Sequence, residues 1–289
     1  DMKKRTKFIL IVILILVVLP LGISTLRKAS TPAVGIVRIE GPIADSLEYL
    51  DIIRKFEEDD RVRAVILRID SPGGRVGPSQ EIYEAVLRLK ESKPVLASMS
   101  SAGASGAYYI ACAADTVYAL SGTMTGSIGV IMEFFDVSGG LQKLGVTAES
   151  ITGGELKSAG SSFRPMTEAE RRYFEEMARD VHEQFKDAVA VSRGMTRQEV
   201  DGYADGRALT GRQALSAGLI DKLGGLDRVI EDARQRAGIE GKPRIVWRQP
   251  SEGMLESLRH LIGSFSPAGF SDAALRRQPV SCRFEYSIQ

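Results

Sequence analysis

Histidine and cysteine are scarce in this chain of 289 residues, which contains two of each. His182 falls on an amphipathic helical pattern and His260 in a weakly patterned C-terminal region, so a histidine-based catalytic triad is not expected. With only two further candidate ligands, Cys112 and Cys282, a His/Cys metal site is not expected either. No phosphate-binding glycine motif is complete. The sequence therefore predicts no metal and no cofactor, and it leaves a Cys112–Cys282 disulfide undecided.

Basic charge is in short supply outside the first 28 residues. Residues 1–28 hold six Lys/Arg and one Asp, whereas the remainder carries 32 basic and 36 acidic side chains, a net charge of −4. A nucleic-acid binder needs a basic surface, so we expect no nucleic-acid partner. Proline is also sparse, with 11 residues against 29 glycines, which indicates tight turns rather than long linkers. The 44% hydrophobic and 26% charged residues are an ordinary globular composition.

One long hydrophobic run lies near the start of the sequence. Residues 8–26 carry no charge and are mostly Ile, Leu, Val or Phe, and as a helix they would span roughly 28 Å, close to the thickness of a bilayer core. A cleaved signal peptide is the alternative, but its apolar region is shorter, and residues 23–27 offer a poor cleavage site. Four Lys/Arg precede the run and two follow it, which favours a cytoplasmic N-terminus. We therefore expect one transmembrane anchor in the cell membrane, in contact with lipid, and a catalytic domain outside the cytoplasm.

Beyond residue 28, short apolar runs alternate with helical patterns. This alternation is typical of an α/β fold in which helices flank a largely parallel sheet. A long helix is expected from residue 168 to about residue 192, because Thr167 and Glu170 form a capping-box pattern at its start. The other expected strands are 34–39, 64–69, 95–99, 116–120 and 127–132, and the other expected helices are 47–57, 79–91, 196–203, 211–217 and 226–237.

A glycine pair follows the second predicted strand. The segment 70–74, Asp-Ser-Pro-Gly-Gly, lies between a buried strand and a helix, so Gly73 and Gly74 can expose backbone amides at the carboxyl end of the strand. Exposed amides of this kind suit an oxyanion hole. A plain strand-to-helix turn explains the same residues equally well.

Ser105 is the candidate nucleophile. It precedes Gly106 at the expected start of a helix, within a stretch of small residues where its hydroxyl can lie near backbone amides. The pattern approaches G-x-S-x-G, but Ala107 replaces the last glycine. Without a histidine, the serine needs another base, and a lysine can serve if its pKa falls from about 10.4 to roughly 7–8. Lys157 stands in a stretch of small residues, although a solvated loop lysine is the ordinary interpretation of such a residue.

These segments, in this order, resemble the short form of the signal peptide peptidase A family, membrane-anchored serine proteases with the Clp protease/crotonase fold. The resemblance covers roughly residues 33–240. DSPGG alone is shared by many crotonase-like proteins, whereas the ordered set is specific. The matching segments are DSPGG at 70–74, ASGAYYIACAAD at 104–115, TGSIGV at 125–130, GELKSAGSSFRPMTEAER at 154–171 and GRALTGRQALSAGLIDKLGGL at 206–226.

The resemblance implies a Ser-Lys dyad that hydrolyses remnant signal peptides and other unstructured apolar polypeptides. Ser105 matches the family nucleophile, Lys157 its general base, and Ser127 a serine that orients the lysine. In the family, serine and lysine come from adjacent subunits of a dome-like ring, so the resemblance also implies a homo-oligomer, an octamer. The supporting and oxyanion-hole positions fall on Gly73, Gly74 and Gly106.

The expected organisation has three parts: a cytoplasmic stub and anchor at 1–28, a Clp/crotonase-like protease domain at 29–240, and a C-terminal extension of open role at 241–289. Three other functions are weighed against the peptidase. A stomatin-partner-like membrane protease would keep the Ser-Lys chemistry and change the substrate. An inactive membrane scaffold would keep only the ring. An acyl-CoA enzyme of the crotonase type would be cytoplasmic, and the apolar run at 8–26 argues against it.

Overall fold

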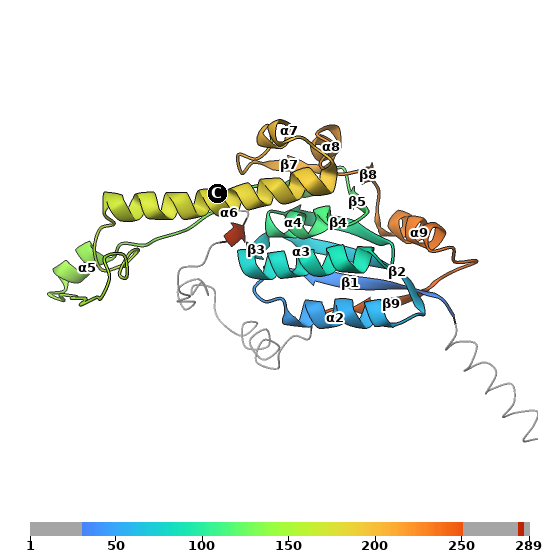
Figure 1. The fold of residues 1–289 in the computed structure, drawn as a ribbon, viewed down its shortest axis with the longest axis horizontal. Coiled ribbons are helices and arrows are strands. Elements are labelled where there is room, and N and C mark those ends of the chain that lie inside the picture. Colours follow the sequence, from blue (N-terminus) through green and yellow to red (C-terminus); the bar gives the residue numbers. More distant parts are fainter. Residues whose placement is uncertain (1–30, 251–282, 286–289) are drawn as a thin grey trace, which may run out of the picture.

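The computed structural model describes residues 31–250 and 283–285 (Figure 1). The expected anchor at 1–28, Cys282, His260 and most of the C-terminal extension lie outside the described residues. Among the described residues, no helix combines the length and the apolar character needed to cross a membrane.

A mostly parallel sheet forms the centre of the protein (Figure 1). Its strands are β1 (Ala33–Glu40), β2 (Val62–Ser71), β4 (Val95–Ala104), β5 (Thr116–Ala119), β6 (Met124–Gly126), β7 (Ala208–Thr210), β8 (Lys222–Leu223) and β9 (Arg244–Arg248). The main path is β7-β6-β4-β2-β1-β9, while β5 pairs with both β4 and β8. Only the β6–β7 pair of this sheet is antiparallel. A separate antiparallel pair joins β3 (Gly73–Arg75) to β10 (Arg283–Glu285).

Helices cover both faces of the sheet, and strand residues alternate between two apolar cores. Ala64 and Ile66 of β2 pack in the core that includes α9, whereas Val65, Leu67 and Ile69 pack in the larger core on the opposite face. Burial on both faces is expected of parallel strands, and it confirms the prediction of an α/β fold with a largely parallel sheet. The helices are α2 (Leu47–Glu58), α3 (Val76–Lys90), α4 (Gly106–Cys112), α5 (Ser138–Lys143), α6 (Glu168–Arg193), α7 (Arg197–Asp201), α8 (Gly211–Ser216) and α9 (Leu226–Arg236).

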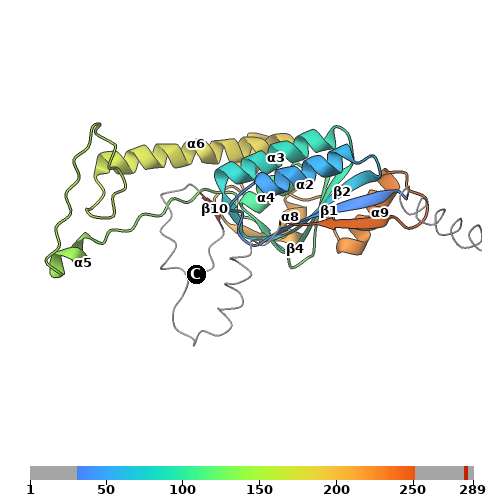
Figure 2. The same cartoon turned by 90° about the horizontal axis from the view of Figure 1, so that it is seen from below.

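The helix α6 has 26 residues, about 39 Å, and extends well beyond the sheet. Both sides of the predicted capping box are present, because Thr167 Oγ1 accepts from Glu170 N and the Glu170 carboxylate accepts from Thr167 N. At the projecting end, residues 131–167, which include α5, form an arm alongside α6 (Figures 1 and 2). At the other end, the Phe185 ring packs against Tyr109 of α4, with 5.0 Å between ring centroids.

Two differences from the sequence prediction change the description of the sheet. The strand expected at 127–132 is wrong: the strand is β6 at 124–126, because Gly126 and Ser127 have φ values of 71° and 50° and a left-handed backbone cannot continue a strand. At the other end of the chain, β9 lies beyond residue 240 and pairs with β1. The main sheet therefore includes residues of the expected C-terminal extension at 241–289.

Candidate active site

Ser105 lies at the turn where the chain leaves β4 and enters α4. Its φ of 53° and ψ of −122° fall outside the regions that L residues ordinarily adopt. Hydrogen bonds hold this turn on both sides: Ser105 N donates to Gly126 O at 2.8 Å, and Tyr109 N donates to Ser105 O at 2.8 Å. A strained serine at a strand-to-helix turn is the geometry of a nucleophile elbow.

The hydroxyl of Ser105 is fully buried in the single chain. Among the residues that the structure describes, its Oγ is the one buried side-chain oxygen or nitrogen atom without a hydrogen-bond partner. An unpaired buried hydroxyl costs about 1–3 kcal/mol. A protein retains such a cost, together with backbone strain, mainly where the group has a chemical role.

Ser127 lies beside the nucleophile. The ladder between β4 and β6 places Gly126 opposite Ala104, so the residues that follow, Ser127 and Ser105, are neighbours in space. Ser127 is buried, and its amide donates to Arg207 O at 2.9 Å. Within residues 31–250 these two serines are the only non-glycine residues with positive φ. Backbone strain is therefore concentrated at the predicted site.

The glycine pair approaches the same place from β2. Gly73 has a φ of 107°, and its amide donates to Ser71 Oγ at 3.1 Å. Ile43 N donates to Gly73 O, and Arg75 N donates to Ile43 O, each at 2.8 Å. Because the backbone amides of an extended strand alternate between its two edges, the Gly74 amide points to the edge opposite Ile43. The Gly74 amide is therefore directed away from Ile43, toward the edge that pairs with β10, and the oxyanion role fits Gly74 better than Gly73.

The second predicted donor is the amide of Gly106, the first residue of α4. The first amides of a helix have no acceptor within the helix, so this N–H is available next to the nucleophile. The ladder between β2 and β4 places Ser71 opposite Gly103 and so brings the glycine pair alongside the elbow. The structure thus brings together the predicted residues Gly73, Gly74, Ser105, Gly106 and Ser127.

Asp70 links the glycine turn after β2 to the end of β4 that leads to Ser105, a role that the sequence did not predict. The β2–β4 register jumps from Ile69 opposite Met99 to Ser71 opposite Gly103. The Asp70 carboxylate bridges this break by accepting from Ala102 N at 3.0 Å and from the hydroxyl of Ser101 at 3.3 Å. An acidic residue directly before the Ser-Pro-Gly-Gly turn was the signal available in the sequence.

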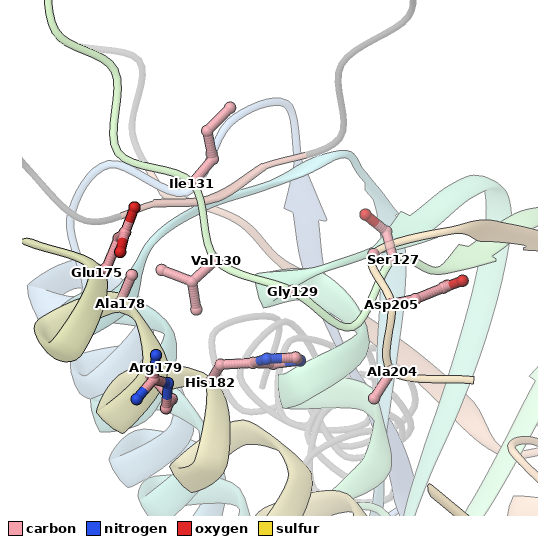
Figure 3. A pocket seen from close by; sticks show the side chains of 11 residues that line it. Ser127, Gly129, Val130, Ile131, Glu175, Ala178, Arg179, His182, Ala204 and Asp205 are labelled. Atoms are coloured by element: carbon pink, nitrogen blue, oxygen red, sulfur yellow. The ribbon is translucent and has the colours of Figure 1, made fainter. Parts of the chain in front are cut away.

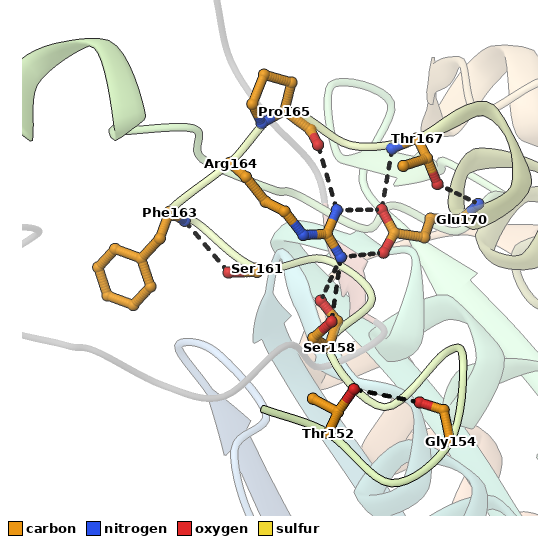
Figure 4. A network of polar contacts seen from close by, with 9 residues as sticks. All are labelled: Thr152, Gly154, Ser158, Ser161, Phe163, Arg164, Pro165, Thr167 and Glu170. Atoms are coloured by element: carbon orange, nitrogen blue, oxygen red, sulfur yellow. Dashed lines mark hydrogen bonds and ion pairs between the residues drawn. The ribbon is translucent and has the colours of Figure 1, made fainter. Parts of the chain in front are cut away.

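Lys157 is not brought to Ser105 within one chain, since Ser105 Oγ has no partner among the described residues. Lys157 is exposed on the arm, and its neighbour Ser158 bonds to Arg164, which in turn bonds to Glu170 near the start of α6 (Figure 4). The helix α4, which follows Ser105, packs against Phe185, farther along α6. Phe185 follows Glu170 by fifteen positions in the helix, about 22 Å along the axis.

A cavity of about 640 Å³ adjoins Ser127 on the side that faces α6 (Figure 3). Glu175, Arg179 and His182 of α6 line it together with Asp205. The His182 Nε2 donates to Ile128 O at 3.2 Å, so this ring is engaged with the backbone of the cavity wall. The cavity has room for a lysine side chain to approach Ser127.

A strained, buried serine with backbone amides beside it defines the class of serine hydrolases built on an α/β fold. Residues 88–240 match the family profile described as Peptidase family S49. The chain belongs to this family, which confirms the resemblance to signal peptide peptidase A and the prediction of a member of a serine protease family.

Three relatives illustrate the match. Serine protease SPPA, chloroplastic, of Arabidopsis thaliana is 38% identical over 211 residues, covering 71% of this chain and 31% of that protein. A protein of Methanocaldococcus jannaschii named as a protease is 30% identical over 241 residues, covering 83% and 78%. A protein of Enterococcus faecium named as signal peptide peptidase SppA is 32% identical over 210 residues, covering 72% and 61%. The matched region therefore spans about a third of the plant protein and most of the archaeal one.

Gly74→Ala is expected to lower peptidase activity about a hundred- to a thousand-fold, the effect of misplacing one oxyanion donor. A Cβ at this position would lie 2.2 Å from Ile43 O and 2.5 Å from Ile43 N, so β3 must move. Gly77→Ala is the matched control, because its Cβ would meet no atom within 4 Å and alanine favours the helix α3. Steady-state peptide cleavage with both variants checks this expectation, and equal activities would contradict the oxyanion assignment.

Proposed function

We propose that the protein is a membrane-anchored serine endopeptidase with a Clp protease/crotonase-like fold. It cleaves unstructured apolar polypeptides, including remnant signal peptides, with Ser105 of one subunit and Lys157 of the next subunit in a homo-oligomeric ring. The observation that carries the proposal is the buried, strained Ser105, whose Oγ lacks a partner among the described residues and which directly precedes Gly106, the first residue of α4.

The chemistry follows from the groups at the site. A neutral Lys157 Nζ takes the proton of Ser105 Oγ as that oxygen attacks the peptide carbonyl carbon. The amides of Gly74 and Gly106 stabilise the resulting oxyanion. When the C–N bond breaks, the lysine ammonium returns its proton to the leaving amine, which yields an ester on Ser105. Lysine then deprotonates a water, and this water hydrolyses the ester and restores the serine.

A second copy of the chain as the source of lysine is supported by three features. Lys157 is held on the arm, about 22 Å along α6 from the contact with α4. The cavity beside Ser127 offers a place for an incoming side chain. The arm also exposes apolar side chains that suit contact with another subunit: Phe135, Leu144, Ile151, Leu156 and Phe163.

An extended polypeptide as substrate is supported by the edge of β3. This edge carries the Gly74 amide and is paired with the antiparallel strand β10 in the single chain, so a substrate strand would take the place of β10. A peptide that adds as a strand needs free backbone groups, which unfolded segments have and folded domains do not. The hydrophobic run at 8–26 in the sequence supports a location in the membrane, where remnant signal peptides accumulate.

The test is mixing of two inactive variants. Ser105→Ala keeps the lysine and Lys157→Ala keeps the serine, so rings assembled from an equal mixture pair an intact serine with an intact lysine at about a quarter of their sites. We expect the detergent-solubilised mixture to recover roughly that fraction of wild-type cleavage of an unstructured apolar peptide. Verified mixed rings without activity would contradict a shared dyad, and an inactive, well-assembled wild type would contradict the peptidase.

A further inference from the structure

We propose that Arg164 is the positioning residue of the general base: it fastens the segment that carries Lys157 to the capped start of α6. The inference rests on the proposed function, because it assumes that Lys157 acts as the base for the serine of another subunit. Arg164 lies in the segment 154–171 that matches the family, yet the sequence assigned it no role.

The guanidinium of Arg164 links two parts of the chain (Figure 4). Its Nη2 donates to Ser158 O at 3.2 Å and to Ser158 Oγ at 3.1 Å, directly next to Lys157. Its Nη1 donates to Glu170 Oε2 at 2.9 Å, and Nη2 bonds to the other carboxylate oxygen. The planar fork of arginine can hold a carboxylate with both nitrogens and still reach a further acceptor.

Glu170 is a firm anchor for this link. Its side chain is buried at the first turn of α6, and Oε2 also accepts from Thr167 N at 2.9 Å within the capping box. Hydrogen bonds from Arg164 and from the Thr167 amide lower the pKa of Glu170 to about 2, so the carboxylate stays ionised at any pH at which a lysine base operates. The link therefore ends on a rigid helix terminus.

The segment around Lys157 needs such a link, because its own structure is only a series of turns. Lys157 N donates to Gly154 O at 3.2 Å, and Ala159 N donates to Leu156 O at 3.1 Å. On its far side, Gly160 fits closely against the Phe134 ring, where a Cβ would lie 2.7 Å from a ring carbon. A general base must be held within hydrogen-bond reach of the proton it removes, so a loosened segment lowers the rate without altering substrate contacts.

The experiment places Arg164→Ala in one partner of the mixed rings at a time. The lysine donor is the subunit that keeps Lys157, and here it carries both Ser105→Ala and Arg164→Ala and is mixed with Lys157→Ala protein. We expect the recovered activity to fall at least ten-fold below that of the reference mixture, which combines Ser105→Ala protein with Lys157→Ala protein. The serine donor is the subunit that keeps Ser105, and here it carries both Lys157→Ala and Arg164→Ala and is mixed with Ser105→Ala protein. The recovered activity should then match that of the reference mixture. Ring assembly is checked by size-exclusion chromatography in each case.

Two further variants separate positioning from general damage. Arg172→Ala removes an exposed arginine of α6 that pairs with Glu168 at 3.6 Å, and it should leave recovery unchanged in either donor. Arg164→Lys in the lysine donor should restore part of the activity, because an ammonium keeps the charge but cannot hold Ser158 and Glu170 with a planar fork. In otherwise unaltered rings, Arg164→Ala should lower kcat and leave KM in place.

The outcomes are distinguishable. Equal losses in both donors would show that Arg164 supports folding or assembly, and equal retention would show that the segment does not need it; either result overturns the inference while the shared dyad stands. If the reference mixture of Ser105→Ala protein with Lys157→Ala protein recovers no activity, that result would instead overturn the proposed function.

Discussion

Ser105→Ala is expected to abolish peptide hydrolysis and at the same time to stabilise the protein. Removal of the nucleophile of a serine peptidase lowers kcat by roughly 10⁶-fold. Stability rises because Ser105 Oγ is buried without a partner among the described residues, and such a hydroxyl costs about 1–3 kcal/mol. Activity and stability are opposed at this residue because the hydroxyl must be free to attack the substrate.

Urea unfolding and peptide cleavage measured on the same preparations check this expectation. The matched control is Ser216→Ala, which removes an exposed hydroxyl on α8 and should change neither quantity. Ser105→Gly should be inactive as well, and it also relieves the φ of 53°, a strain of roughly 1–3 kcal/mol. An active Ser105→Ala protein would contradict the nucleophile assignment, and a protein destabilised by the change would contradict the cost assigned to the unpaired hydroxyl.

The helices and strands that the sequence predicted are those that form because of residues close together in the chain. The capping box at Thr167 and Glu170 requires only residues three apart, and the structure has both of its hydrogen bonds. The strands β1, β2 and β4 each contain a short apolar run, which helices on both faces of the sheet bury. Periodicity and capping therefore predicted the α/β fold without knowledge of its long-range contacts.

The strand expected at 127–132 shows where this reasoning fails. These residues have an apolar pattern, but the chain turns at Gly126 and Ser127 into left-handed conformations. The turn is held by contacts distant in sequence: Ser105 N bonds to Gly126 O, and Ser127 N bonds to Arg207 O. A local pattern contains no information about such partners.

The candidate site also contains residues that the sequence predicted and residues that it did not. Ser105 and the glycine pair were visible as a small-residue elbow and a glycine turn at strand ends. Lys157 was assigned by resemblance alone, and the single chain does not place it at Ser105. The links through Asp70 and Arg164 were not predicted, because each depends on a side chain reaching a backbone group whose position is set by the folded chain.

Lys157→Ala and Lys157→Arg are both expected to lose activity by at least about a thousand-fold, while fold and assembly are retained. Lys157 is exposed on the arm, so its replacement disturbs no packing within the chain. Arginine is the informative change: a guanidinium stays protonated at every accessible pH and cannot accept the proton of Ser105 Oγ. If the side chain at 157 served only to supply positive charge near the developing oxyanion, arginine would retain much of the activity.

Lys143→Ala and Lys143→Arg provide the matched pair, because Lys143 is also exposed on the arm, in the last turn of α5. Both should retain wild-type cleavage from pH 6 to 10. An inactive Lys157→Arg protein of normal size, beside an active Lys143→Arg protein, would leave proton transfer as the property that arginine fails to supply. An active Lys157→Arg enzyme would instead assign the base to another group and would remove the reason for a lysine delivered by a second subunit.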